Sequence, residues 1–165
     1  MFGGLLYTAP RVTCNDESMN IDGTDYDDDD GQIHHLTVDE CWDALLSSSL
    51  GRLAVSVGGT PEIFPVNFIA ADRRLLFRTS PGTKLAELTV NNRVAFEADG
   101  VGRDEAWSVV VKGTASVLER QSDVDTADML PLRPLIPTVK PIYVEISPTQ
   151  VTGRRFQLGP EPLRS

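Results

Sequence analysis

Apolar and polar residues alternate with a period of two through most of the chain after residue 50, which is typical of β-strands. In residues 52–57, for example, every second side chain is a large aliphatic one. Turn residues separate the strand segments that this pattern predicts: residues 52–57, 62–70 with a bend at Pro65, 75–79, 93–99, 106–119 relaxed at Gly113, and 142–156. Gly58 and Gly59 predict a hairpin turn after the first strand, and Asp72 and Arg73 predict a tight connection after the second.

A helix is predicted just before the first strand. Thr37 and Glu40 form a capping box, in which the Thr37 hydroxyl accepts from the Glu40 amide and the Glu40 carboxylate reaches back. Apolar residues then recur on one helical face, and Gly51 is placed to end the helix. Cys41 falls on the apolar face, and no histidine is placed by sequence to activate it. We therefore interpret Cys41 as a core residue.

Two further short helices are predicted at residues 83–90 and 122–130, the second capped by Ser122. Short strands at hairpin spacing, with only short helices between them, favour a small closed antiparallel barrel. The chain has no βαβ alternation and lacks the glycine-rich phosphate fingerprint, which disfavours a dinucleotide-binding fold. The expected fold class is therefore mainly β.

Charge is distributed unevenly along the chain. The net charge is -9, and the first 35 residues hold 8 of the 24 acidic side chains but only one of the 15 basic ones. A like-charge run cannot recover its ordering entropy by burial, so residues 1–34 are predicted to be a disordered acidic tail. The barrel domain is expected at residues 35–158, followed by a short C-terminal tail at 159–165. The acidic run lacks the glutamate of a calcium-binding loop, so no metal site is predicted.

Composition excludes several classes of protein. A pI near 4.6 argues against nucleic-acid binding, because phosphate backbones require a basic face. No apolar run approaches the roughly 20 residues that span a bilayer, and the N-terminus lacks a secretory signal. Cys14 and Cys41 are too few for a disulfide scaffold. These features predict a cytoplasmic protein with no membrane or nucleic-acid partner.

The most informative segment for chemistry is residues 77–88, where a strand, a turn and the start of a helix follow one another. The first amides of a helix have no internal partners, and the helix dipole favours an anion there. This terminus is surrounded by three hydroxyls and two cations: Thr79, Ser80 and Thr83, and Arg78 and Lys84. They are the components of a phosphate-binding loop. The alternative is an ordinary capped helix, with Ser80 or Thr83 as the cap and Lys84 in solvent.

Five segments in this order resemble the pyridoxamine 5′-phosphate oxidase-like, FMN-binding split-barrel family, over residues 38–156. The matching segments are residues 49–54, 65–68, 78–84, 106–115 and 153–156. The similarity is strongest to a small bacterial branch of flavin-binding proteins. It implies a six-stranded antiparallel split β-barrel that forms a homodimer, with two flavins at the subunit interface.

The resemblance also implies roles for individual residues. The loop Arg78, Thr79, Ser80, Thr83 and Lys84 would hold the FMN phosphate, with Lys84 as its main counter-charge. Two further groups would contact the flavin: Pro65, Val66 and Asn67 along the isoalloxazine edge, and Trp107 and Ser108 from the partner subunit. Two alternatives remain open. The Asn67 side chain forms a hydrogen bond with the backbone at a strand end, and Trp107 packs in the core or at the dimer interface without contacting the flavin.

The chain also departs from the true oxidases of this family. Its end after Phe156 is short and has no tryptophan, and Thr83 stands where the oxidases have a second basic residue. Activity on pyridoxamine phosphate is therefore not expected. No catalytic acid or base is identified, because His34 and His35 fall at the end of the predicted tail. If the protein is an enzyme, the flavin carries the redox chemistry.

Three functional hypotheses follow. The first is a flavin- or deazaflavin-dependent oxidoreductase that acts on a small organic substrate. The second is a non-catalytic flavin-binding module, and the third is a barrel that has lost its cofactor. The intact loop from Arg78 to Lys84 argues against the third hypothesis. FMN and a deazaflavin cofactor present a phosphate to the same loop, so the sequence leaves the choice between them open.

Overall fold

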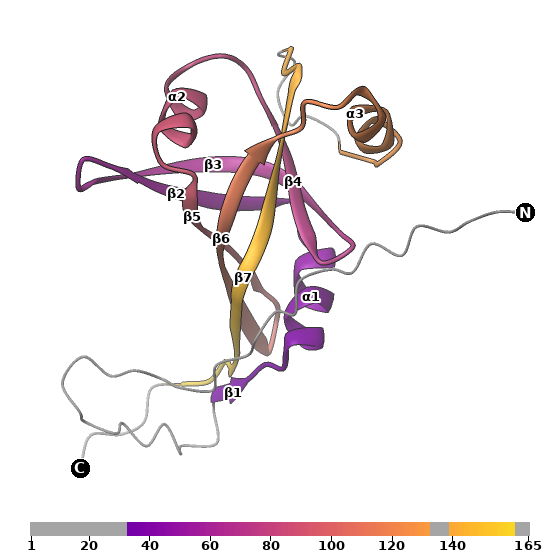
Figure 1. Cartoon of the computed structure of the whole chain (residues 1–165). Coiled ribbons are helices and arrows are strands. Elements are labelled where there is room, and N and C mark those ends of the chain that lie inside the picture. The colour runs from indigo at the N-terminus through magenta and orange to yellow at the C-terminus, as the bar shows by residue number, and fades with distance from the viewer. Residues whose placement is uncertain (1–32, 133–138, 161–165) are drawn as a thin grey trace, which may run out of the picture.

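The computed structural model describes residues 33–132 and 139–160 (Figure 1). Most of the predicted acidic tail, residues 1–32, lies outside the described residues, as do residues 161–165. The elements in chain order are β1 (Ile33–His35), α1 (Val38–Leu46), β2 (Leu50–Val57), β3 (Thr60–Ala71), β4 (Arg74–Thr79), α2 (Thr83–Val90), β5 (Arg93–Val101), β6 (Glu105–Val117), α3 (Gln121–Asp128) and β7 (Ile142–Gln157). No helix within these ranges is long and apolar enough to cross a membrane.

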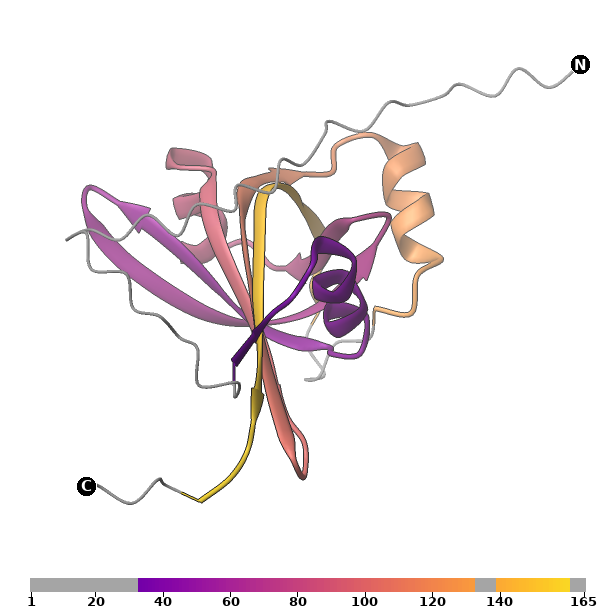
Figure 2. The same cartoon turned by 90° about the horizontal axis from the view of Figure 1, so that it is seen from below.

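Six antiparallel strands close into a ring in the order β7-β4-β3-β2-β5-β6, and β6 pairs with β7 to complete it (Figures 1 and 2). This closed ring confirms the split β-barrel. The predicted count of six strands omitted β1, a seventh strand that pairs with the C-terminal end of β7 outside the ring. Its three residues, Ile33–His35, are too few to show an alternation, and only the long-range pairing with β7 makes them a strand.

The ring encloses the main core. Every second residue of each strand points inward, and the inward set includes the fully buried Phe68, Phe77 and Phe96. The rings of Phe68 and Phe96 meet edge to face, with centroids 4.8 Å apart. Helix α1 adds Cys41, which is completely buried, so the expectation of a core cysteine is confirmed.

A second apolar cluster lies outside the ring. We call residues 118–132 and 139–141, the described part of the connection from β6 to β7, the α3 arm. Ala127 and Leu132 of this arm pack against Leu76 of β4 and Tyr143 of β7. Figure 2 shows α3 on the outside of the sheet, on a different side from α1. The arm therefore covers part of the outer surface at one end of the barrel.

The helix boundaries correct two predictions. The capping box of Thr37 and Glu40 is present, but α1 ends at Leu46, where the Ser47 amide donates back to the last turn. Gly51 belongs to β2 instead of ending the helix. Helix α3 starts after Arg120 without a side-chain cap, so Ser122 does not cap it. In both cases short backbone hydrogen bonds satisfy the helix end, which the sequence pattern does not reveal.

Gly51 is required where β2 passes over the core. A Cβ at this position would lie 2.3 Å from Cζ of Phe96 and 2.7 Å from the backbone oxygen of Glu97. Gly51→Ala should therefore lower the free energy of unfolding by about 1–3 kcal/mol, because neither neighbour can move freely. Urea unfolding measures the effect, with Gly159→Ala as the control because its Cβ would meet no atom within 4 Å. Equal stability of the two variants would contradict this account of the packing.

Candidate anion-binding site

The end of β4 and the residues that lead into β7 meet at one end of the barrel, and α2 stands at the same end (Figure 1). A small depression, without enclosed space for a water molecule, is lined there by Asn67, Arg78, Leu132 and Lys140. The Arg78 Nε donates a hydrogen bond to the Lys140 carbonyl over 2.7 Å. Because this contact joins the end of β4 to the residues before β7, it fixes one wall of the depression.

Lys84 extends this cluster from the first turn of α2. Its Nζ lies 5.3 Å from the ring centroid of Phe64 and 6.0 Å from that of Phe77, so its stem is half-buried among aromatic side chains. This burial lowers the pKa of the Lys84 ammonium below its ordinary value, and the nearby charge of Lys140 lowers it further. The alternative of a solvent-exposed Lys84 is therefore wrong.

The cluster has no counter-charge of its own. Arg78, Lys84 and Lys140 form no ion pair with any carboxylate in the described part of the chain, whereas Arg52 and Arg74 each do. Other described cations, such as Arg103 and Lys112, also lack an ion pair, so what distinguishes this group is the closeness of its like charges. The repulsion between Lys84 and Lys140 raises the energy of the free site, and a bound anion would relieve it.

The start of α2 is also open to a ligand. Its N-cap is Gly82, and no side chain accepts a hydrogen bond from the first turn, so neither Ser80 nor Thr83 caps the helix. The Thr79 side chain is buried, and its hydroxyl donates to the Ser80 carbonyl over 3.3 Å. Ser80 and Thr83 are exposed. The free amides of α2 and these two hydroxyls can therefore donate to an anion.

The three residues of β3 that were predicted to contact the flavin lie in different environments. Asn67 lines the depression, but its Nδ2 donates to the Ser49 carbonyl over 2.7 Å, as the strand-end alternative proposed. The Val66 side chain is buried in the ring, so only its backbone is available to a ligand. Pro65 is exposed on the outer surface of the sheet. Asn67 is thus the residue of this group that lies beside Arg78.

We define the outer sheet face as the outward residues of β3, β2, β5 and β6. Cross-strand pairing sets Pro65 beside Arg52, Arg52 beside Glu97, and Glu97 beside Val110. Ser108 has the same outward orientation as Val110, two residues further along β6. Pro65, Asn67 and Ser108 therefore share the outer sheet face.

Trp107 lies elsewhere. It is partly buried against the main core, and its indole covers Gly100 on the neighbouring strand. It pairs with Arg155 of β7, whereas Arg78 pairs with Tyr143 near the other end of that strand. At about 3.3 Å per residue, this part of β7 is roughly 40 Å long. A single chain therefore does not bring Trp107 or its neighbour Ser108 to Arg78 and Lys84.

Two residues near the depression escaped the sequence analysis. Lys140 contributes a cation and a backbone acceptor, and the Tyr143 ring lies against the Arg78 guanidinium with 4.9 Å from the ring centroid to Cζ. Both follow a proline-rich stretch that gives no regular pattern. The available signal was composition: the chain has only three lysines, and Lys84 and Lys140 are two of them.

A closed six-stranded antiparallel ring with a cationic depression at one end is a split β-barrel with a site suited to an anionic ligand. The sequence profile of the pyridoxamine 5′-phosphate oxidase family matches residues 37–155. The chain belongs to this family.

Individual relatives agree with this assignment. A solved structure from Corynebacterium glutamicum, provisionally named a pyridoxamine 5′-phosphate oxidase, is 43% identical and has a TM-score of 0.73, with 79% of this chain and 97% of that chain covered. The FAD-binding protein of Mycobacterium smegmatis is 42% identical with a TM-score of 0.66, covering 75% and 98%. An uncharacterised protein of Mycobacterium tuberculosis is 31% identical, with 76% of this chain and 86% of its own length covered.

The electrostatics of Lys84 can be measured directly, because the chain has only three lysines. In carbon-13 NMR of labelled lysine side chains, Lys84 should titrate below the ordinary lysine value of 10.5. Lys140→Met should shift this titration upward, because it removes a like charge. A phosphate ligand should also shift it upward, since an anion favours the protonated ammonium. A Lys84 titration that Lys140→Met leaves unchanged would show that the two charges are not coupled.

Proposed function

We propose that this protein binds a flavin through the flavin's phosphate group, as a homodimer, and acts as a flavin-dependent oxidoreductase on a small organic substrate. The observation that carries the proposal is that Arg78 and Lys140 line one depression, with Lys84 near enough for its charge to interact with that of Lys140. The similarity to the FAD-binding protein of M. smegmatis supports a flavin as the ligand.

Each part of the site has a role in this proposal. The two Arg78 Nη groups and the ammonium groups of Lys84 and Lys140 neutralise the phosphate, and the first amides of α2 donate to its oxygens. Pro65 and Asn67 lie along the ring system through backbone and side-chain groups. When bound, the flavin supplies the redox chemistry, while the chain supplies binding and orientation.

FMN is the expected cofactor, and a deazaflavin is the alternative. Both carry a phosphate, as does FAD, so the cationic cluster suits each of them. The absorption spectrum of the purified protein separates a deazaflavin from FMN or FAD, because a deazaflavin absorbs at shorter wavelength, and the mass of the released cofactor separates FMN from FAD. A colourless protein that takes up none of the three would contradict the proposal.

Turnover decides whether the protein is an oxidoreductase. Reduction of a panel of small organic acceptors by the loaded protein and a reduced cofactor would support an enzyme. Binding without any turnover would favour the second candidate, a flavin-binding or storage module. A separate assay offers pyridoxamine 5′-phosphate as an electron donor to the oxidised, loaded protein, and no oxidation is expected because the chain lacks the basic and aromatic residues expected for its phosphate.

The homodimer is proposed from the outer sheet face. The consecutive valines of β6 divide between the two faces: Val109 and Val111 are completely buried in the ring, and Val110 lies on the outer sheet face. On β3 and β2 the same face exposes 67% of Ile63 and 48% of Leu50. A second copy that covers this apolar surface would bring its own Ser108 to the interface, and Trp107 near it, as the resemblance implies.

The phosphate role of Lys84 is tested by Lys84→Met, which keeps an apolar stem among the aromatic side chains. FMN affinity should fall on the order of 10- to 150-fold, because a charge-assisted contact is lost. Riboflavin lacks the phosphate, so its affinity should stay unchanged. Arg103→Met removes an exposed positive charge from the turn between β5 and β6 and serves as the matched control. An equal loss for FMN and riboflavin would exclude Lys84 as a phosphate ligand.

The dimer is tested by placing a charge on the outer sheet face. Ile63→Asp should shift the sedimentation coefficient from dimer to monomer at micromolar concentration and weaken flavin binding with it. Leu46→Asp at the end of α1 changes a similarly exposed apolar side chain away from this face and should do neither. A wild-type protein that sediments as a folded monomer would refute the dimer and the interface-bound flavin together.

A further inference from the structure

Arg78 is held in place by residues that sequence reasoning did not connect with it. Its Nε donates to the Lys140 carbonyl over 2.7 Å, and its guanidinium lies against the ring of Tyr143 with 4.9 Å from Cζ to the centroid. The Nη groups have no partner among the described residues. A guanidinium fixed at its Nε and on one face therefore keeps its Nη donors free for a ligand.

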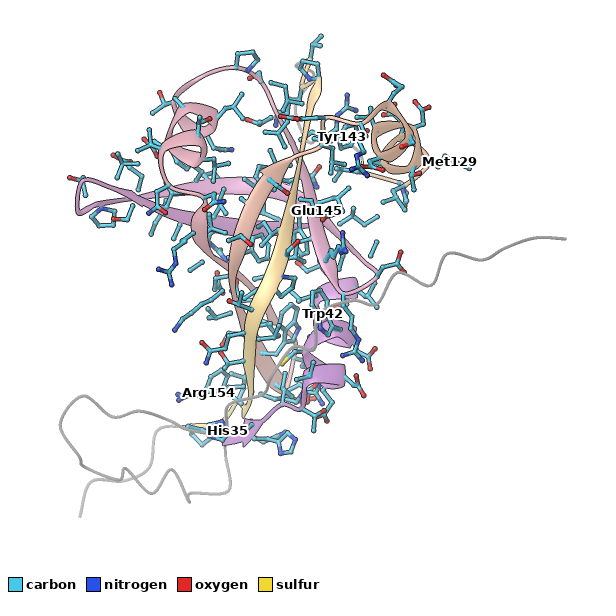
Figure 3. All side chains as sticks on the ribbon, viewed as in Figure 1. His35, Trp42, Met129, Tyr143, Glu145 and Arg154 are labelled. Atoms are coloured by element: carbon cyan, nitrogen blue, oxygen red, sulfur yellow. The ribbon has the colours of Figure 1, made fainter. Side chains whose placement is uncertain are left out.

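Tyr143 is itself fixed. Its side chain is only 4% exposed, and its hydroxyl donates to Oδ1 of Asp128, at the end of α3, over 2.5 Å. The Asp128 carboxylate makes no ion pair with Arg78, so it orients the tyrosine without neutralising the arginine. Figure 3 shows Tyr143 beside α3, close to the start of β7. The chain of contacts thus runs from Asp128 through Tyr143 to Arg78.

This arrangement lowers the cost of binding an anion. A free arginine side chain loses rotamer freedom when it binds a phosphate, whereas a guanidinium already fixed on a ring has lost most of that freedom. The ring also stabilises the positive charge in a site that holds two further cations. Both effects act on the anionic group of a ligand and leave its uncharged part unaffected.

We propose that Tyr143, oriented by Asp128, is a positioning residue that holds Arg78 ready for the phosphate of the ligand, so that the α3 arm is a working part of the binding site. The proposal rests on the proposed function for the identity of the ligand. The competing explanation is that Tyr143 only packs in the cluster with Leu76, Ala127 and Leu132.

Three variants separate positioning from packing. Tyr143→Leu keeps an apolar side chain but removes both the ring and the hydroxyl. Tyr143→Phe is the milder change, because it keeps the ring on Arg78 and removes only the hydrogen bond to Asp128. Val124→Ala is the control, because Val124 packs against the same cluster from α3.

The first measurement needs no ligand. In nitrogen-15 NMR of the free protein, the Arg78 Nε–Hε group, assigned with an Arg78→Lys variant, should exchange slowly with water. Tyr143→Leu should raise the exchange rate at least tenfold, and Tyr143→Phe should raise it by a smaller factor. Val124→Ala should leave the rate within twofold of the wild-type value. Slow exchange in Tyr143→Leu would overturn the proposal.

The second measurement compares FMN with riboflavin. Tyr143→Leu should weaken FMN binding about 3- to 30-fold and riboflavin binding less than twofold, because only the phosphate uses Arg78. Val124→Ala should change both affinities by the same factor. An equal loss for both ligands in Tyr143→Leu would reduce Tyr143 to a packing residue. If the wild-type protein binds neither flavin, the proposed function fails, and the exchange measurement still decides whether Tyr143 positions Arg78.

Discussion

The closure of the ring through β7 is the constraint on which the rest of the structure depends. β7 pairs with β6 on one side and with β4 on the other, and near its C-terminal end also with β1. Backbone hydrogen bonds in these ladders fix the register, and the register sets Arg78 opposite Tyr143. Because Lys140 stands just before β7, the same closure brings it to the end of β4. The candidate site is therefore a product of strand pairing between distant parts of the chain.

The site also imposes an energetic conflict on the fold. Bringing Lys84 and Lys140 together opposes folding through repulsion, and partial burial of Lys84 adds a desolvation cost. Acidic residues beside these cations would make the folded state more stable. Such pairing occurs elsewhere on the sheet, where Arg52 forms ion pairs with Glu97 and Asp99. A lysine whose pKa is lowered by burial and by a like charge, as that of Lys84 is, is typical of binding and active sites.

The sequence predicted those parts of the fold that local patterns encode. The period of two located all six ring strands, the capping box located α1, and the loop from Arg78 to Lys84 marked the start of α2. Contacts across long sequence separations were missed: β1 exists only through its pairing with β7, and no spacing rule links Lys140 or Tyr143 to Arg78. Trp107 shows the converse limit. Its motif suggested a flavin contact, which stays a prediction, and its distance from Arg78 along β7 follows from the strand register, which only the three-dimensional structure shows.

The pairing of β1 with the end of β7 has a practical consequence for handling the protein. Ile33 lies opposite Phe156, so the first and last strands of the described chain run side by side at the end of the barrel away from Arg78 (Figure 1). A surface tether or a fused domain attached beyond either strand thus joins the barrel at that end. Both strands by which the described chain enters and leaves the barrel are therefore remote from the cationic depression.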